Sequence, residues 1–126
     1  MKRLWIAIAI LLAIFSATIW NARSLDGFLS GLHELLAQAE AAAESGQWEV
    51  ARQLTDQALE RWESHSVYLH TVLRHSDMDQ VDTSFGEVQE FLQCQESGEY
   101  SASNAQLMTQ LMLICEAEQL TLQNIL

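Results

Sequence analysis

The chain has 126 residues, of which 49% are hydrophobic and 18% charged, with two cysteines and no proline. This length suits one modest domain and excludes a multidomain enzyme. Seventeen acidic side chains against six lysines and arginines give a formal charge of -11, which excludes nucleic acid as a partner because phosphate requires clustered cations. Two cysteines are too few for a disulfide framework or a structural zinc module.

An uncharged apolar segment runs from Leu4 to Trp20, close to the start of the chain. As a helix, its 17 residues cover about 25 Å, which is the short end of a bilayer crossing. Trp5 and Trp20 stand near its ends, where indole rings favour the lipid interface. The segment predicts a membrane anchor comprising residues 1–23.

A cleaved secretory signal peptide is the alternative interpretation of this segment. Its cleavage site would require small residues three positions and one position before the cut. Cuts after Ala17 and Ala22 place Phe15 and Trp20 at the more distant of these positions. The apolar run is also longer than a usual signal peptide core, so we expect an uncleaved anchor.

The charges around the apolar segment predict its orientation. Lys2 and Arg3 precede it, so the cation bias keeps the N-terminus in the cytoplasm. Residues 24–126 then form an extracytoplasmic domain in the cell envelope. This domain contains all seventeen acidic groups and only Arg52, Arg61 and Arg74 as cations, and its formal charge is -14.

Small residues recur every four positions inside the apolar segment, at Ala9, Ala13 and Ala17. They place a stripe on one side of the helix that permits close approach of a partner helix. Alanine is also common in lipid-facing positions, so both interpretations stay open.

The remainder of the chain shows helical spacing of apolar residues. We expect one helix from Leu25 to Ser45, continuous with the anchor, and a second of about 28 residues from Trp48 to His75. A third helix and a fourth, after a break at Gly98, complete the domain. The predicted core-facing residues are Leu25, Phe28, Leu29, Leu32, Leu35, Leu36 and Ala39; Ala51, Leu54, Ala58, Leu59, Trp62, Leu69 and Val72; Met78, Val81, Phe85, Val88 and Leu92; and Leu107, Leu111, Ile114, Leu120 and Leu122.

A short repeat marks the turns between these helices. The segment Glu44-Ser45-Gly46-Gln47-Trp48 recurs as Glu96-Ser97-Gly98-Glu99-Tyr100, at a spacing of 52 residues. Glycine suits the turn, and the aromatic residue closes the next helix onto the previous one. The predicted fold is all-α: an N-terminal transmembrane helix followed by two antiparallel helical hairpins that form a four-helix bundle.

The first turn resembles the middle of a tetratricopeptide repeat. Ala43, Gly46, Trp48, Ala51 and Ala58 match its small and aromatic positions over about 25 residues. The 52-residue spacing differs from the 34 residues of that family, and Ser103 stands where the second turn should have alanine. The resemblance implies a hairpin packed in this style rather than a repeat array.

The whole chain resembles domain-of-unknown-function family 4363, a group of small bacterial membrane-anchored helical proteins. The resemblance rests on the Lys-Arg-Leu-Trp start, the single span, Trp62, Tyr68-Leu69, the segment Arg74-His75-Ser76-Asp77-Met78-Asp79, and the closing residues Leu120 to Leu126. It implies a fold and a location, and it assigns no catalytic residue.

Histidines and carboxylates are the candidate metal ligands. His65, His70 and His75 recur every five residues, a spacing that rotates successive side chains of one helix away from each other. We expect His65 to pack in the core. The segment from His75 to Asp82 gathers three carboxylates but lacks the ligand positions of an EF-hand loop. We expect Ser76 and Asp77 to cap the third helix, with a weak divalent cation site as the alternative.

Acidic side chains form two ribbons, one with Asp56, Glu60 and Glu63 and one with Glu40 and Glu44. Such ribbons are usually solvated faces, and a docking surface for a basic partner is the functional alternative.

Cys94 and Cys115 are the two candidates for a disulfide. In a hairpin that turns near Glu99 their heights differ by about 16 Å, whereas a bridge needs Cα atoms within about 7 Å. We expect two buried thiols instead.

These features favour a non-catalytic accessory or scaffolding protein that contacts the lipid bilayer and an envelope or membrane partner. A sensor or ligand-binding bundle is the alternative, and an enzyme is the weakest class because nucleophile and phosphate-loop motifs are missing. The sequence indicates no catalytic, cofactor-binding or metal residue, no cofactor and no small-molecule substrate.

Overall fold

The computed structural model describes residues 1–125, with the side chains of residues 21, 22, 72, 118, 119 and 121–125 outside the description. This part of the chain contains five helices and no strand: α1 (Lys2–Glu44), α2 (Trp48–Ser64), α3 (Ser66–Val72), α4 (His75–Cys94) and α5 (Ser97–Ile125). The predicted all-α fold is confirmed, and the apolar segment and the first domain helix form one continuous helix, as expected.

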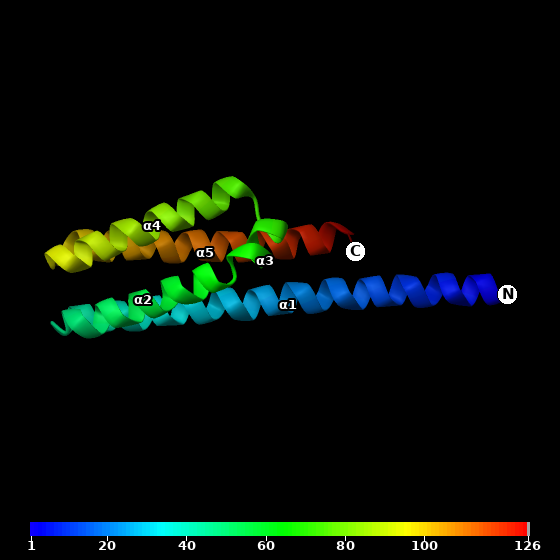
Figure 1. Cartoon of the computed structure of the whole chain (residues 1–126), viewed down its shortest axis with the longest axis horizontal. Coiled ribbons are helices and arrows are strands. Elements are labelled where there is room, and N and C mark those ends of the chain that lie inside the picture. Colours follow the sequence, from blue (N-terminus) through cyan, green and yellow to red (C-terminus); the bar gives the residue numbers. More distant parts are fainter. Residues whose placement is uncertain (126) are drawn as a thin grey trace.

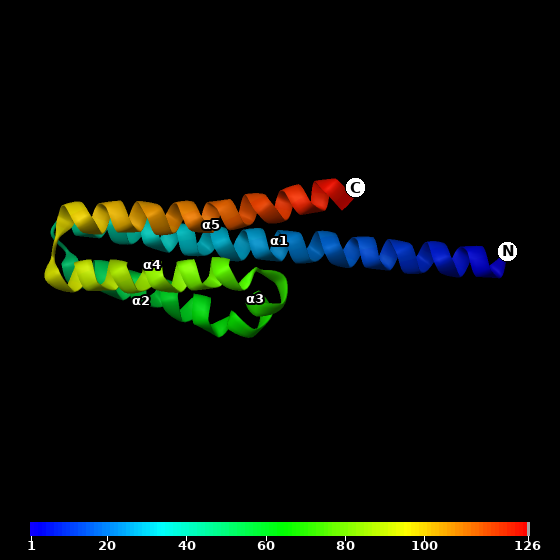
Figure 2. The same ribbon diagram turned by 90° about the horizontal axis from the view of Figure 1, so that it is seen from above.

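The helices form an elongated bundle (Figures 1 and 2). Helix α1 packs along α2 and along α5, and α4 packs along α5, whereas α2 and α4 meet more loosely. The tight turns after α1 and α4 lie together at one end, here called the distal end. Helix α3 and the end of α5 lie at the other, here called the proximal end, from which α1 continues alone to the N-terminus.

The core is built from the predicted apolar faces. Most of the residues expected to face inward are buried, and Phe28, Leu35, Leu54 and Leu59 pack partly buried against them. The prediction that Leu120 faces the core is wrong, because 59% of its surface is exposed. The side chains of Val72 and Leu122, which were also expected inside, lie outside the described residues.

The predicted second helix is broken at His65 into α2 and α3. Near the break the Ser64 hydroxyl donates to the Arg61 carbonyl at 2.9 Å, and His65 Nδ1 donates to the same carbonyl at 3.0 Å. Such side-chain bonds compete with the helical backbone pattern. The bend lets Leu69 turn inward, where it is fully buried.

The two distal turns have the same backbone hydrogen bonds, but a different residue adopts the left-handed conformation in each. Gly46 has φ 79° in the first turn, and Gln95 has φ 56° in the second. Bonds from Gln47 N to Ala42 O and from Glu96 N to Phe91 O close the two turns. The predicted break at Gly98 is therefore wrong, since Gly98 lies inside the first turn of α5.

The equivalent turn residues, Gly46 and Gln95, are 49 positions apart rather than the predicted 52. Adding 49 to the residue numbers of the first hairpin aligns its buried positions with those of the second. The pairs in which both members are buried are Leu29 and Met78, Leu32 and Val81, Leu36 and Phe85, Ala39 and Val88, Ala43 and Leu92, Ala51 and Tyr100, Thr55 and Asn104, Ala58 and Leu107, and Trp62 and Leu111. The bundle thus consists of two hairpins with one common burial pattern.

Candidate functional site

Three side-chain hydrogen bonds join α1 to α5 and fix how the two helices are aligned. The Ser101 hydroxyl donates to Glu40 Oε1 at 2.6 Å, Asn104 Nδ2 donates to the Leu36 carbonyl at 3.1 Å, and the Cys115 thiol donates to Asp26 Oδ1 at 2.7 Å. From the first bond to the last, both helices advance by fourteen residues in opposite directions. Glu40 was predicted to lie on a solvated acidic ribbon. It is instead partly buried and accepts a hydrogen bond between α1 and α5.

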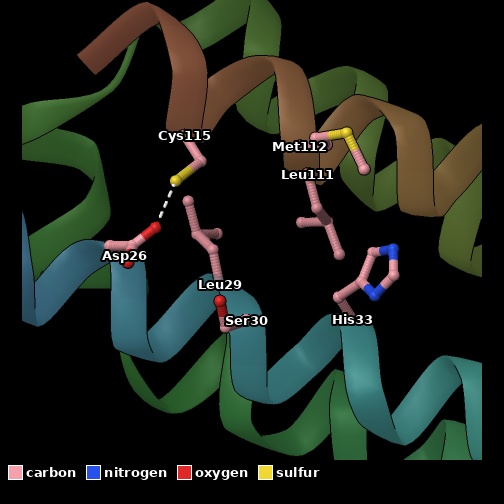
Figure 3. A pocket seen from close by; sticks show the side chains of 7 residues that line it. All are labelled: Asp26, Leu29, Ser30, His33, Leu111, Met112 and Cys115. Carbon is pink, nitrogen blue, oxygen red and sulfur yellow. Dashed lines mark hydrogen bonds between the residues drawn. The ribbon is translucent and has the colours of Figure 1, made fainter. Parts of the chain in front are cut away.

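A groove of about 240 Å³ lies between α1 and α5 towards the proximal end (Figure 3). It is lined by Asp26, Leu29, Ser30, His33, Leu111, Met112 and Cys115. Figure 3 shows Asp26 and Cys115 at one end and His33 at the other, with Leu29 and Leu111 between them. The volume is below the roughly 300–1,000 Å³ of typical small-molecule sites.

The thiol in this groove is not an activated nucleophile. Burial raises the pKa of Cys115 to about 11, and the hydrogen bond to Asp26 and the charges of Asp26 and Glu116 act in the same direction. His33 lies two turns from Asp26 and cannot act as the base that removes the thiol proton. Since a thiolate is the reactive form, Cys115 is a poor nucleophile at neutral pH.

The two cysteines are both present as thiols, on different helices. The prediction that both are buried is wrong for Cys94, which is exposed on the last turn of α4, and Cys115 is half-buried. Cys94 is the last residue of α4, at the distal end.

A second groove, of about 330 Å³, lies where α2 and α4 pack loosely. Trp62 Nε1 donates to Asp82 Oδ1 at 2.8 Å across it, and Gln89 Nε2 donates to Asp56 Oδ1 at 3.0 Å. The lining combines apolar side chains such as Met78 with carboxylates and an imidazole. Its volume reaches the lower limit of small-molecule sites.

The carboxylates between His75 and Asp82 do not converge on one point. Asp79 pairs with His75 at 3.6 Å, and Asp82 bonds to Trp62 on another helix. The predicted caps are wrong, because Arg74 is the N-cap residue of α4 and no side-chain cap bond forms. Asp77 lies in the first turn of α4, where its negative charge interacts favourably with the helix dipole.

The three histidines were predicted to lie on one helix and to point away from one another, but the breaks in this helix change their arrangement. His65 is exposed rather than packed in the core, and its ring lies against that of Phe28, with 4.3 Å between the ring centroids and the planes tilted by 36°. The rings of His70 and His75 come within 5.9 Å because the chain bends between α3 and α4. Among the described residues, no group of three His, Cys, Asp or Glu side chains is placed to hold a metal ion.

Acidic side chains cover the outer surfaces of α2 and α4 and the distal end. On α2, Glu60 and Glu63 are exposed. In the described part of the chain Arg52 forms an ion pair with Glu49, and His75 lies 3.6 Å from Asp79 and pairs with it when protonated. At the distal end the pKa of Glu96 is raised, because its protonated carboxyl can donate a hydrogen bond to Glu99 and because the negative charge of Glu99 disfavours its ionised form. Most of this negative surface therefore has no cation beside it.

Comparison with known protein families gives one match. Residues 19–125 match the model of a family described as Domain of unknown function (DUF4363). The chain belongs to this family. No curated protein and no solved structure matches the chain. Membership covers the whole bundle and assigns no chemistry to any of its residues.

One helix of the described chain, α1, is long and apolar enough to cross a membrane. None of its most apolar stretch is buried in the bundle. Ala9, Ala13 and Ala17 are exposed on it.

Proposed function

We propose that this protein is a non-catalytic, single-pass membrane protein that presents an acidic helical bundle as an accessory or scaffolding module. The anchor comprises residues 1–23, with the N-terminus in the cytoplasm and residues 24–126 outside it. The observation that carries the proposal is the division of α1. None of its most apolar stretch is buried, whereas its second half supplies core residues from Leu25 onwards.

The two halves of α1 suit two different surroundings, lipid for the first half and water for the second. An exposed apolar helix of this length is unfavourable in water and favourable in lipid. Lys2 and Arg3 then remain on the cytoplasmic side, and the domain of charge -14 lies on the other.

Two experiments test the anchor and its orientation. Protease added to intact, wall-stripped cells is expected to digest the bundle and spare the anchor. N-terminal sequencing of the mature protein is expected to begin upstream of Leu4. A mature chain that starts after Trp20, or a bundle that resists protease until the cells are lysed, would contradict the proposal.

The acidic surface of α2 supports a docking role for a basic partner. Glu60 and Glu63 are exposed, and neither is used in a described hydrogen bond or ion pair, unlike Asp56. We expect Glu60→Lys with Glu63→Lys to reduce chemical crosslinking to the partner in native membranes. Glu34→Lys, at an exposed position of α1, is the matched control. Equal crosslinking by both variants would exclude this surface.

The alanine stripe is the proposed contact for a partner helix within the membrane. Replacing Ala9, Ala13 and Ala17 by Leu keeps the segment apolar and blocks close approach. Unchanged recovery of membrane partners after this replacement would leave the stripe facing lipid.

A sensor or ligand-binding bundle is a second candidate, favoured by the groove between α2 and α4. Its apolar walls and its two carboxylates, Glu63 and Asp82, suit a small organic cation. A ligand of the folded state stabilises it by about 2.7 kcal/mol at a hundredfold excess over its Kd. A melting temperature that no divalent ion or organic cation raises would remove this candidate.

A further inference from the structure

The groove between α1 and α5 and the groove between α2 and α4 occupy equivalent places in the bundle. The offset of 49 residues relates α1 to α4 and α2 to α5, so the α1–α5 seam corresponds to the α2–α4 seam. Five residues that line the first groove have equivalents that line the second: Leu29 with Met78, His33 with Asp82, Leu111 with Trp62, Met112 with Glu63, and Cys115 with Ser66. The bundle therefore has a groove at the same place in both seams.

The two grooves differ in charge. The α1–α5 groove has one carboxylate, Asp26, which accepts the hydrogen bond of the Cys115 thiol. The α2–α4 groove has a carboxylate on each side, Glu63 on α2 and Asp82 on α4, at positions whose equivalents are methionine and histidine. Glu63 has no hydrogen bond or ion pair within the described part of the chain, and no described lysine or arginine lines this groove. Its negative charge is therefore not neutralised within the bundle.

The floor of the α2–α4 groove is apolar. Trp62, Met78 and Phe85 line it and are buried, whereas Glu63 and Asp82 are exposed beside it. Lysine and arginine side chains bury their methylene stems on apolar surface and keep the charged head in water. An apolar floor with carboxylates at its edge suits such a side chain.

Gly86 leaves one wall of this groove without a side chain. It lies inside α4, where glycine costs about 1 kcal/mol relative to alanine. An added β-carbon would meet no other part of the described chain within 4 Å, so packing of the bundle does not require glycine here. The absence of a side chain instead keeps the groove accessible from outside.

A further groove of about 290 Å³ continues along the α2–α4 seam. The two grooves share Gln89 in their linings, and the further one also contains Arg52 and Asp56, whose charges offset each other. From Arg52 to Glu63, α2 rises by about 16 Å. This length exceeds one side chain or one small cation, which favours a segment of a protein as the occupant.

We infer that the α2–α4 groove receives a lysine or arginine side chain from a basic segment of the docking partner. The stem lies on Trp62, Met78 and Phe85, and the charged head lies between Glu63 and Asp82. This inference rests on the proposed docking role for a basic partner and states where the charge of that partner is bound.

Binding of a fluorescently labelled, lysine-rich helical peptide to the full-length protein in nanodiscs of zwitterionic lipid tests the inference by fluorescence anisotropy. Glu63→Gln with Asp82→Asn removes both charges of the groove, and asparagine retains an acceptor oxygen. Glu60→Gln with Glu87→Gln removes two exposed charges from the same helices outside this groove and is the matched control. Gly86→Leu keeps every charge and fills the groove. Circular dichroism melts check that each variant folds.

The groove double variant and Gly86→Leu are each expected to raise the Kd of the peptide by about fivefold or more, and the control double variant by less than about twofold. Equal weakening by the two double variants, or unchanged binding by Gly86→Leu, would place the peptide on the outer acidic surface. Either result overturns the inference and leaves the docking role intact. Failure of the parent protein to bind the peptide also overturns it, and a melting temperature raised by free butylammonium would then assign the groove to a small cation.

Discussion

The two hairpins share a burial pattern but use different side chains at equivalent positions. Trp62 in the first corresponds to Leu111 in the second, Thr55 to Asn104, and Gly46 to Gln95. The apolar spacing is the same, so the fold depends on where side chains are buried more than on which side chains fill the sites. The differences at equivalent sites show what each hairpin adds to this shared plan.

The largest expected effect concerns Trp62, because it is fully buried and also bonds to Asp82. Trp62→Ala should lower the free energy of unfolding by about 4 kcal/mol, and Leu111→Ala at the equivalent position by about 3 kcal/mol. Urea denaturation of the full-length protein in mild detergent, followed by circular dichroism, measures both. A loss below about 1 kcal/mol at Trp62 would contradict its place in the core.

The buried polar pair Thr55 and Asn104 should respond with opposite signs. Asn104 Nδ2 donates to the Leu36 carbonyl across the α1–α5 seam, so Asn104→Ala should cost about 2 kcal/mol. The Thr55 hydroxyl is buried without a partner, so Thr55→Val should be neutral or stabilise by up to about 1 kcal/mol. The same urea titration compares them, and equal losses at both sites would show that the Thr55 hydroxyl has a partner.

The distal turns provide a smaller contrast. A residue with a β-carbon costs about 1 kcal/mol in the left-handed conformation that Gly46 and Gln95 adopt. Gly46→Ala should therefore destabilise the protein by about 1 kcal/mol although no atom crowds the new methyl group. Gln95→Gly should stabilise it by up to about 1 kcal/mol. Thermal melts in the same detergent check both signs, with Gly98→Ala inside α5 as the control.

Apolar spacing predicted the helices and nearly all of the core, because burial of one helix face follows directly from the sequence pattern. It missed the buried polar residues Thr55 and Asn104, since spacing of apolar residues alone cannot assign a polar residue to the interior. The turn repeat misled at Gly98, because the residue that adopts the left-handed conformation depends on backbone closure rather than on the presence of glycine. The break at His65 depends on local side-chain bonds to Arg61, which have no apolar signature.

The smallest effect is a difference in reactivity between Cys94 and Cys115. With its pKa raised to about 11, Cys115 has roughly one thiolate per thousand molecules at pH 8, and its alkylation rate should rise about tenfold per pH unit up to that pKa. A maleimide at pH 8 should therefore modify the exposed Cys94 first, as mass spectrometry of peptides would show.

Asp26→Asn sharpens this last contrast, because it removes a charge that opposes the Cys115 thiolate and should accelerate labelling of Cys115 without affecting Cys94.

The raised pKa of Cys115 also affects stability, because the folded state holds the thiol proton more tightly than the unfolded chain does. The resulting stabilisation is complete below pH 9 and is lost as the pH rises from about 9 to about 11. In Cys115→Ser that part of the alkaline decline should disappear, whereas an unchanged decline would assign it to other groups, among them Tyr100, whose pKa is raised by burial and by the charges of Glu40 and Glu44.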